Sequence, residues 1–339
     1  MRRCFLHIGT HKTGTTSIQH LLSRSSSALA EKGYFYPQSG RLEELPGHHN
    51  LAWEISGDPR FRKNAGTSDD LLREVKDKSA HIILSSEDFG ASLDHEARFS
   101  AFLSSVELSG FSVTIIVYLR NQVDFLPRVY LTHLHAGWDL TWRESLMKID
   151  HSKLLDGVRE NDRLPQAYRI LLHSGSALTR RRSILDADYC DFLRRARENA
   201  NVELIVRSYD QARTSICGDF LSIFNLGLSD LHVDGEVWLN ASLPLREYLL
   251  LFLRNRMGRE LLENEKTAVN ALVPAEAKEI ALSPAERVHL FQKFRHDNRT
   301  LSVQYGIPEP EIGDISEVKD SPDAPYIDRL FSENMVSRL

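Results

Sequence analysis

The sequence has few cysteines and no long apolar segment. The chain of 339 residues contains only Cys4, Cys190 and Cys217, which are far apart. Their spacing excludes a disulfide framework and the local Cys pairs of common metal sites. No apolar run approaches the ~20 residues of a membrane-spanning helix, and the run Cys4–Ile8 is shorter than a signal-peptide core of roughly 7–15 residues. We therefore expect a cytoplasmic protein without an integral membrane segment.

Excess positive charge is absent as well. The formal net charge is −5, and residues 303–339 alone contain eight acidic and three basic residues. The rest of the chain is therefore formally neutral, which excludes the basic excess that is typical of nucleic-acid binding. Four prolines also lie between Ile307 and Pro325. We predict a main domain over residues 1–302 and an acidic, proline-containing C-terminal arm over residues 303–339.

Short apolar runs alternate with amphipathic helical patterns along the chain. We predict strands at Cys4–Ile8, His81–Ser86, Ser112–Leu119 and Val202–Val206. This alternation indicates an α/β fold, in which helices cover both faces of a central parallel sheet. The later helical patterns predict a helical C-terminal part. Residues 40–66, which are rich in Gly, Pro and His, are expected to be irregular.

A loop bracketed by two glycines follows the first predicted strand. The segment reads CFLHIGTHKTGTTSIQ, and four residues separate Gly9 from Gly14, as in a Walker A loop. A Walker A loop has lysine directly after its second glycine, whereas this chain has Thr15 there and Lys12 inside the loop. Loop N–H groups and the N-terminus of the next helix both bind anions. The segment therefore predicts a phosphate site in a P-loop-type three-layer sandwich; an ordinary strand–turn–helix is the alternative.

Polar residues follow two other predicted strands. Glu87 and Asp88 come directly after the strand His81–Ser86, and Arg120 comes directly after Ser112–Leu119. The carboxyl ends of parallel strands form the edge at which open α/β sheets bind ligands. We therefore expect Glu87 and Arg120 to lie at the same edge as the glycine-bracketed loop.

Three segments resemble the sulfotransferases that use 3′-phosphoadenosine 5′-phosphosulfate (PAPS). LHIGTHKTGTTSIQ is similar to the 5′-phosphosulfate loop of bacterial members. VYLRNQVDFLPRVY resembles the 3′-phosphate motif, in which a strand ends in Arg and a Ser follows eight residues later. Arg120 matches the Arg, whereas Arg128 replaces the Ser and offers a second phosphate-binding guanidinium. IILSSEDF places Glu87 where the heparan-modifying members have a catalytic Glu.

The resemblance implies transfer of a sulfuryl group from PAPS to a hydroxyl or amine acceptor, with a saccharide as the first candidate. The products are the sulfated acceptor and adenosine 3′,5′-bisphosphate (PAP), and no metal is required. Lys12 would balance charge on the leaving group and Glu87 would act as the base. The residues implied in binding the cofactor are Gly9, Thr10, His11, Lys12, Thr13, Gly14, Thr15, Thr16, Arg120 and Arg128.

Several alternatives remain open on the sequence alone. Some members of the family use a His base, for which His48 and His49 are the candidates. A P-loop kinase for a small molecule would need Mg²⁺, held by Thr15 or Thr16 and an acidic ligand such as Asp88. A non-catalytic nucleotide-binding relative is favoured by the replacement of Ser by Arg128. Residues 138–200 have no recognisable motif, and we expect them to form an insertion that shapes the acceptor site.

Overall fold

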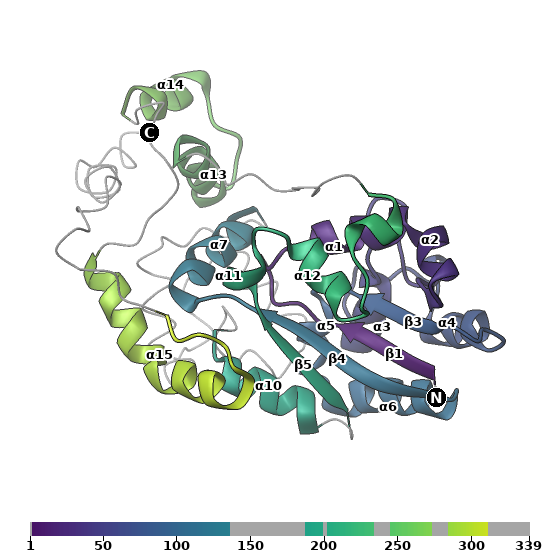
Figure 1. Ribbon diagram of the computed structural model, residues 1–339. Helices are drawn as coiled ribbons and strands as arrows, with labels where there is room; N and C mark the ends of the chain where they lie inside the picture. Colours follow the sequence, from purple (N-terminus) through teal and green to yellow (C-terminus); the bar gives the residue numbers. More distant parts are fainter. Residues whose placement is uncertain (1, 136–186, 199–201, 234–244, 273–283, 311–339) are drawn as a thin grey trace. The chain divides into compact units, whose positions relative to one another are not determined.

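The structure is a computed structural model that describes residues 2–135, 187–198, 202–233, 245–272 and 284–310 (Figure 1). The chain divides into two compact units, which are described separately. The first comprises Met1–Arg120, Asp188–Leu239 and Asp297–Glu309. The second comprises Asn121–Ala187, Asn240–His296 and Pro310–Leu339.

A five-stranded parallel sheet forms the centre of the first unit. The strands are β1 (Arg2–His7), β2 (Tyr34–Phe35), β3 (His81–Ser85), β4 (Phe111–Leu119) and β5 (Glu203–Ser208). Their order is β2-β3-β1-β4-β5, and every pair of neighbours is parallel. Leu6 of β1 pairs with Leu84 of β3 and with Ile115 of β4. The carboxyl ends of these three strands therefore meet at one edge, as predicted.

The apolar runs form strands because both of their faces are buried. In β4, every residue except Ser112 is buried, and Cys4–His7 of β1 is buried in the same way. Such continuous runs, rich in β-branched residues, are typical of central strands in parallel sheets. The predicted strands are thus confirmed, with β5 extending beyond its predicted end to Ser208.

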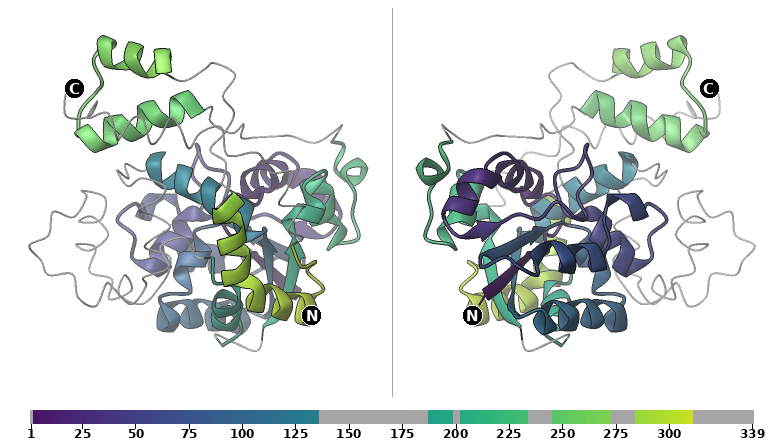
Figure 2. Two further views of the ribbon diagram at one scale, coloured as in Figure 1. Left: turned by 90° about the vertical axis from the view of Figure 1, so that its left-hand side faces the viewer. Right: turned by 90° about the vertical axis from the view of Figure 1, so that its right-hand side faces the viewer.

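Helices cover both faces of the sheet (Figures 1 and 2). On one face, Ile18 of α1 and Phe220 of α12 share an apolar cluster with Phe5 of β1. On the other, α6 packs against β4 and is joined by α3, α4 and α5. The helices of this unit are α1 (Thr15–Arg24), α2 (Ser26–Glu31), α3 (His49–Ser56), α4 (Ser68–Val75), α5 (Phe89–Ser92), α6 (Glu96–Leu108), α10 (Tyr189–Glu198), α11 (Tyr209–Ala212) and α12 (Ile216–Ser222). The α/β sandwich is thus confirmed.

The prediction that residues 40–66 are irregular is wrong over α3. This helix begins after His48 and ends at Ser56, and it buries Leu51, Trp53 and Ile55. Its start contains two histidines and an asparagine, which are weak helix formers. Tertiary burial of the apolar face outweighs this low propensity. The consequence is functional, because α3 carries His49 to the end of β3.

The described part of the second unit is helical. It contains α7 (Gln122–His135), α13 (Leu245–Met257) and α14 (Glu263–Leu272), and α13 packs against both other helices. The helix α15 (Pro284–Tyr305) begins in this unit. These elements confirm the helical C-terminal part, although α14 was not predicted. None of the described helices has the length and apolar character needed to cross a membrane. The predicted insertion (138–200) and arm (303–339) lie mostly outside the described residues and stay predictions.

Candidate functional site

The loop between β1 and α1 has a backbone that requires its glycines. Gly14, the residue before α1, has a φ of 79°, and Lys12 has a φ of 61°. A Cβ at Gly14 would also lie 2.8 Å from Cγ1 of Ile216. At Gly9, a Cβ would lie 2.7 Å from Oγ1 of Thr15. Left-handed backbone and close packing together keep the loop tight against the N-terminus of α1.

The threonines of the loop divide into two groups. Thr10 donates its hydroxyl hydrogen to the carbonyl of Tyr118 at 3.0 Å, and Thr13 donates to the carbonyl of Thr10 at 2.6 Å. These two hydroxyls hold the loop in shape. The hydroxyl of Thr15 is buried but has no hydrogen-bond partner among the described residues. Buried hydroxyls are almost always paired, so Thr15 Oγ1 is the hydroxyl that a bound phosphate would engage. Thr16 is half-buried, and His11 and Lys12 are exposed.

Arg120 lies beside the loop, at the end of β4. Its Nη1 donates to the carbonyl oxygen of Lys12 at 3.2 Å, and its guanidinium lies 4.8 Å from the ring centre of Tyr209. The hydroxyl of Tyr189 donates to the carbonyl of Arg120 at 2.8 Å. The arginine is therefore anchored where a second phosphate contact was predicted. Arg128 belongs to α7 in the other unit, where its Nη1 donates to the carbonyl of Asp124. Joint use of the two arginines stays a prediction.

Glu87 lies against the first half of the loop. Its Cβ is 3.7 Å from the position of a Cβ built at Gly9. The side chain is 21% exposed, and its Oε2 accepts a hydrogen bond of 3.0 Å from Nε2 of Gln19 on α1. The structure thus brings Glu87 and the glycine-bracketed loop together. Sequence reasoning missed Gln19, whose only signal was an amide between Ile18 and Leu21 on the buried side of a helix.

His49 connects the two acidic residues that follow β3. Its Nδ1 lies 3.0 Å from Oδ2 of Asp88 and 3.0 Å from Oγ of Ser86, and its Nε2 lies 3.9 Å from Oε2 of Glu87. Burial disfavours the charged ring, but the hydrogen bond to Asp88 and both negative charges outweigh it and raise the pKa of His49. Burial by itself would raise the pKa of Asp88, yet His49 holds that pKa below its ordinary value. Asp88 therefore orients the ring and favours its protonated form.

His48 has the opposite environment. The ring is completely buried, and burial lowers its pKa to about 3. Its Nδ1 accepts a hydrogen bond from the backbone N–H of Ser85 at 3.2 Å, so its Nε2 carries the hydrogen and donates to the carbonyl of Pro37 at 3.1 Å. Both ring nitrogens are used by the backbone. His48 therefore has no nitrogen left for an acceptor, and of the two candidate histidines only His49 stays at the site.

One oxygen of Asp88 is occupied by hydrogen bonds. Its Oδ2 accepts from His49 and from Nε1 of Trp53 at 2.8 Å. Across the described ranges, no group of three or more His, Cys, Asp or Glu side chains is arranged to hold a metal. Oδ2 of the predicted magnesium ligand of the kinase alternative therefore orients His49.

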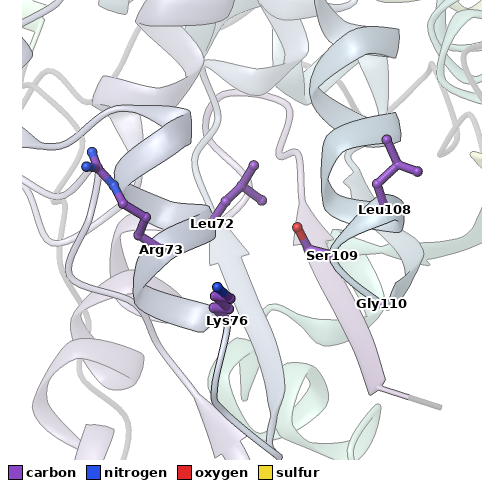
Figure 3. A pocket seen from close by; sticks show the side chains of 6 residues that line it. All are labelled: Leu72, Arg73, Lys76, Leu108, Ser109 and Gly110. Carbon is purple, nitrogen blue, oxygen red and sulfur yellow. The ribbon is translucent and has the colours of Figure 1, made fainter.

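A separate pocket of about 530 Å³ lies at the opposite end of the strands (Figure 3). It is lined by Leu72, Arg73, Lys76, Leu108, Ser109 and Gly110. Gly110 directly precedes β4, so the pocket is at the amino end of the sheet. Open α/β sheets bind their ligands at the carboxyl end. The pocket is therefore not part of the candidate site.

Comparisons with known proteins add little to this geometry. No family model matches the chain, and no curated protein does. Among solved structures, a sulfotransferase from Alicyclobacillus acidocaldarius matches with a TM-score of 0.37 and 16% identity, over 77% of this chain and 98% of that one. A similarity of this size carries no argument about activity. The functional conclusion must come from the site itself.

Proposed function

We propose that the protein transfers a sulfuryl group from PAPS to a hydroxyl or amine acceptor. The observation that carries the proposal is the meeting of two groups at one sheet edge. The buried Thr15 hydroxyl at the end of the loop has no partner among the described residues, and Glu87 packs with its Cβ beside Gly9 of the same loop. An anion cradle next to a base is what transfer from a phosphate-activated donor requires.

The residues of the loop fit the phosphosulfate end of the donor. The hydroxyls of Thr15 and Thr16 and the N–H groups at the start of α1 would bind the 5′-phosphate. Lys12 would place its positive charge against the bridging oxygen, and Arg120 would bind the 3′-phosphate. PAPS supplies the activated sulfuryl group. A Cβ at Gly9 would lie 2.7 Å from Oγ1 of Thr15, so glycine at this position leaves room for the hydroxyl that is proposed to bind the phosphate.

The chain supplies two functions during transfer. Glu87 takes the proton of the acceptor hydroxyl as that oxygen forms its bond to sulfur, in line with the bond that breaks. Lys12 balances the negative charge that develops on the departing oxygen of PAP. Proton removal by a placed base contributes ~10²–10⁴-fold in rate, and stabilising charge at the leaving oxygen contributes comparably.

A small-molecule kinase would need a carboxylate for Mg²⁺, and one oxygen of Asp88, Oδ2, already accepts from both His49 and Trp53. Glu87 is the proposed base, and His49 is the alternative.

Nucleotide binding and turnover test the proposal together. Calorimetry should show tighter binding of PAP than of Mg-ATP. Incubation with ³⁵S-labelled PAPS and a panel of acceptors, saccharides first, should transfer label equally well with and without EDTA. Tighter binding of Mg-ATP, or transfer that EDTA abolishes, would support the kinase instead. Binding of PAP without turnover of any acceptor would favour the non-catalytic relative.

A further inference from the structure

The helix α1 carries a buried polar side chain that faces the candidate base. Gln19 is 2% exposed, like its apolar neighbours Ile18 and Leu21. A buried carboxamide needs hydrogen-bond partners. Its Nε2 donates to Oε2 of Glu87 at 3.0 Å. The contact joins the helix that follows the loop to the residue that follows β3.

The backbone at Gly47 packs closely against the carboxamide of Gln19. A Cβ at Gly47 would lie 2.5 Å from Cδ, 2.6 Å from Nε2 and 2.8 Å from Oε1 of Gln19. A side chain at position 47 would therefore force the carboxamide of Gln19 to shift. The amide of Gln19 is thus held in place by a glycine on one side and by Glu87 on the other.

The two oxygens of Glu87 have different surroundings. Oε2 receives the hydrogen bond from Gln19 and lies 3.9 Å from Nε2 of His49. Oε1 receives no hydrogen bond from the described residues, and the side chain is partly exposed. Because Oε2 already accepts a hydrogen bond, Oε1 is the oxygen of Glu87 that is available to accept a proton.

We infer that Gln19 is a positioning residue that holds Oε2 of Glu87, so that Oε1 takes the proton of the acceptor. The inference rests on the proposed function of Glu87 as base. Without the amide, the carboxylate is free to turn toward the ring of His49, whose Nε2 is only 3.9 Å from Oε2. A closer contact there would draw the carboxylate away from the acceptor. Gln19 therefore fixes the direction of the Glu87 carboxylate.

The substitution Gln19→Leu tests this because it keeps the side-chain bulk and removes the amide. Release of ³⁵S-sulfate from labelled PAPS, with water as the acceptor, should fall about 10–100-fold, as misplaced catalytic groups usually cause. The pKa of His49, followed by NMR of its ring, should rise as the carboxylate approaches it. Affinity for PAP, measured by calorimetry, should stay unchanged.

Two further variants control for structural damage. Gly47→Ala keeps the amide but pushes it out of place, so it should lower sulfate release and raise the His49 pKa in the same way. Ser23→Ala changes a residue one turn further along α1, whose hydroxyl accepts a hydrogen bond from Arg41. That variant should leave both quantities unchanged.

The possible results separate the inference from the proposed function. Normal PAP binding in Gln19→Leu, with unchanged sulfate release and an unchanged His49 pKa, overturns the positioning role alone. An unmodified protein that does not bind PAP overturns the proposed function, and the catalytic meaning of the Gln19 contact with it. Slower release together with a raised His49 pKa, in both Gln19→Leu and Gly47→Ala, supports the inference.

Discussion

The two ends of the central sheet use polar side chains in different ways. At the amino end, Arg2 donates to the carbonyls of Lys78 and Ser109, both at 2.6 Å, and to that of Val75 at 3.3 Å. At the carboxyl end, Thr15 Oγ1 and Glu87 Oε1 have no hydrogen-bond partner among the described residues. At the amino end, the hydrogen bonds of Arg2 thus stabilise the fold. At the carboxyl end, some polar atoms have no partner among the described residues, which is typical of an edge that binds a ligand.

The neighbouring residues His48 and His49 repeat this contrast at close range. His48 bonds only to backbone groups, and burial lowers its pKa to about 3. His49 bonds to Asp88 and Ser86, and the acidic residues raise its pKa. His48 therefore stabilises the fold, whereas His49 interacts with the acidic side chains of the candidate site. The predictions below are ordered from the largest expected effect to the smallest.

The strongest test of the carboxyl end is Glu87→Gln. The substitution keeps the volume and the acceptor oxygen but removes the basic carboxylate. We expect kcat for sulfuryl transfer to fall by ~10²–10⁴-fold, with PAP affinity near that of the unmodified protein. His49→Ala should reduce kcat far less. Normal turnover by Glu87→Gln, with an inactive His49→Ala, would assign the base to the histidine.

Substitutions of Arg120 and Arg2 allow a direct comparison of the two ends of the sheet. Arg120→Ala should weaken PAP binding by ~1.5–3 kcal/mol, because a charge-assisted hydrogen bond to the 3′-phosphate is lost. Binding of adenosine 5′-phosphosulfate, which lacks that phosphate, should hardly change. Arg2→Ala removes backbone contacts at the amino end and should lower thermal stability while PAP binding persists. Equal losses for both nucleotides in Arg120→Ala would make this arginine structural.

Substitutions at two glycines with positive φ distinguish an effect of loop geometry on PAP binding from the general cost of backbone strain. Gly14→Ala combines a left-handed φ of 79° with a Cβ 2.8 Å from Ile216. We expect a loss of stability of about 1–2 kcal/mol from the backbone and weaker PAP binding. Gly33 has a similar φ of 83°, but a Cβ there meets nothing within 4 Å. Gly33→Ala should cost stability only. Urea unfolding measures the stability of both variants, and calorimetry measures their affinity for PAP. Equal PAP affinities of the two variants would contradict a role of the loop in binding PAP.

The smallest expected effect is the pH dependence that His49 gives to stability. Its folded pKa is raised, so its charge stabilises the fold fully below the unfolded value of about 6.5, and this contribution is lost as pH rises through the folded pKa. Urea unfolding of the unmodified protein and of His49→Gln should therefore differ more at pH 5.5 than at pH 9. A difference that grows with pH would contradict the ion pair with Asp88.

Much of the fold was predictable because local patterns and burial agree. The strands β1, β3 and β4 are continuous apolar runs, and parallel pairing needs little more than such runs separated by helices. The region of α3 was not predictable in the same way. His48, His49 and Asn50 have low helix propensity, and the helix forms because Leu51 and Trp53 are buried against the rest of the unit.

The sequence by itself determined the glycine-bracketed loop and the edge to which Glu87 and Arg120 belong. Glycines at fixed spacing and the ends of apolar strands are local features, and parallel strands place their carboxyl ends together. Only the tertiary structure decided which polar atoms are already paired. Gln19, His49 and Asp88 come from three segments, and nothing in their spacing shows that one amide holds Glu87 while one carboxylate holds His49. Hydrogen bonds depend on distances of a few tenths of an ångström, and such distances exist only once the elements have packed.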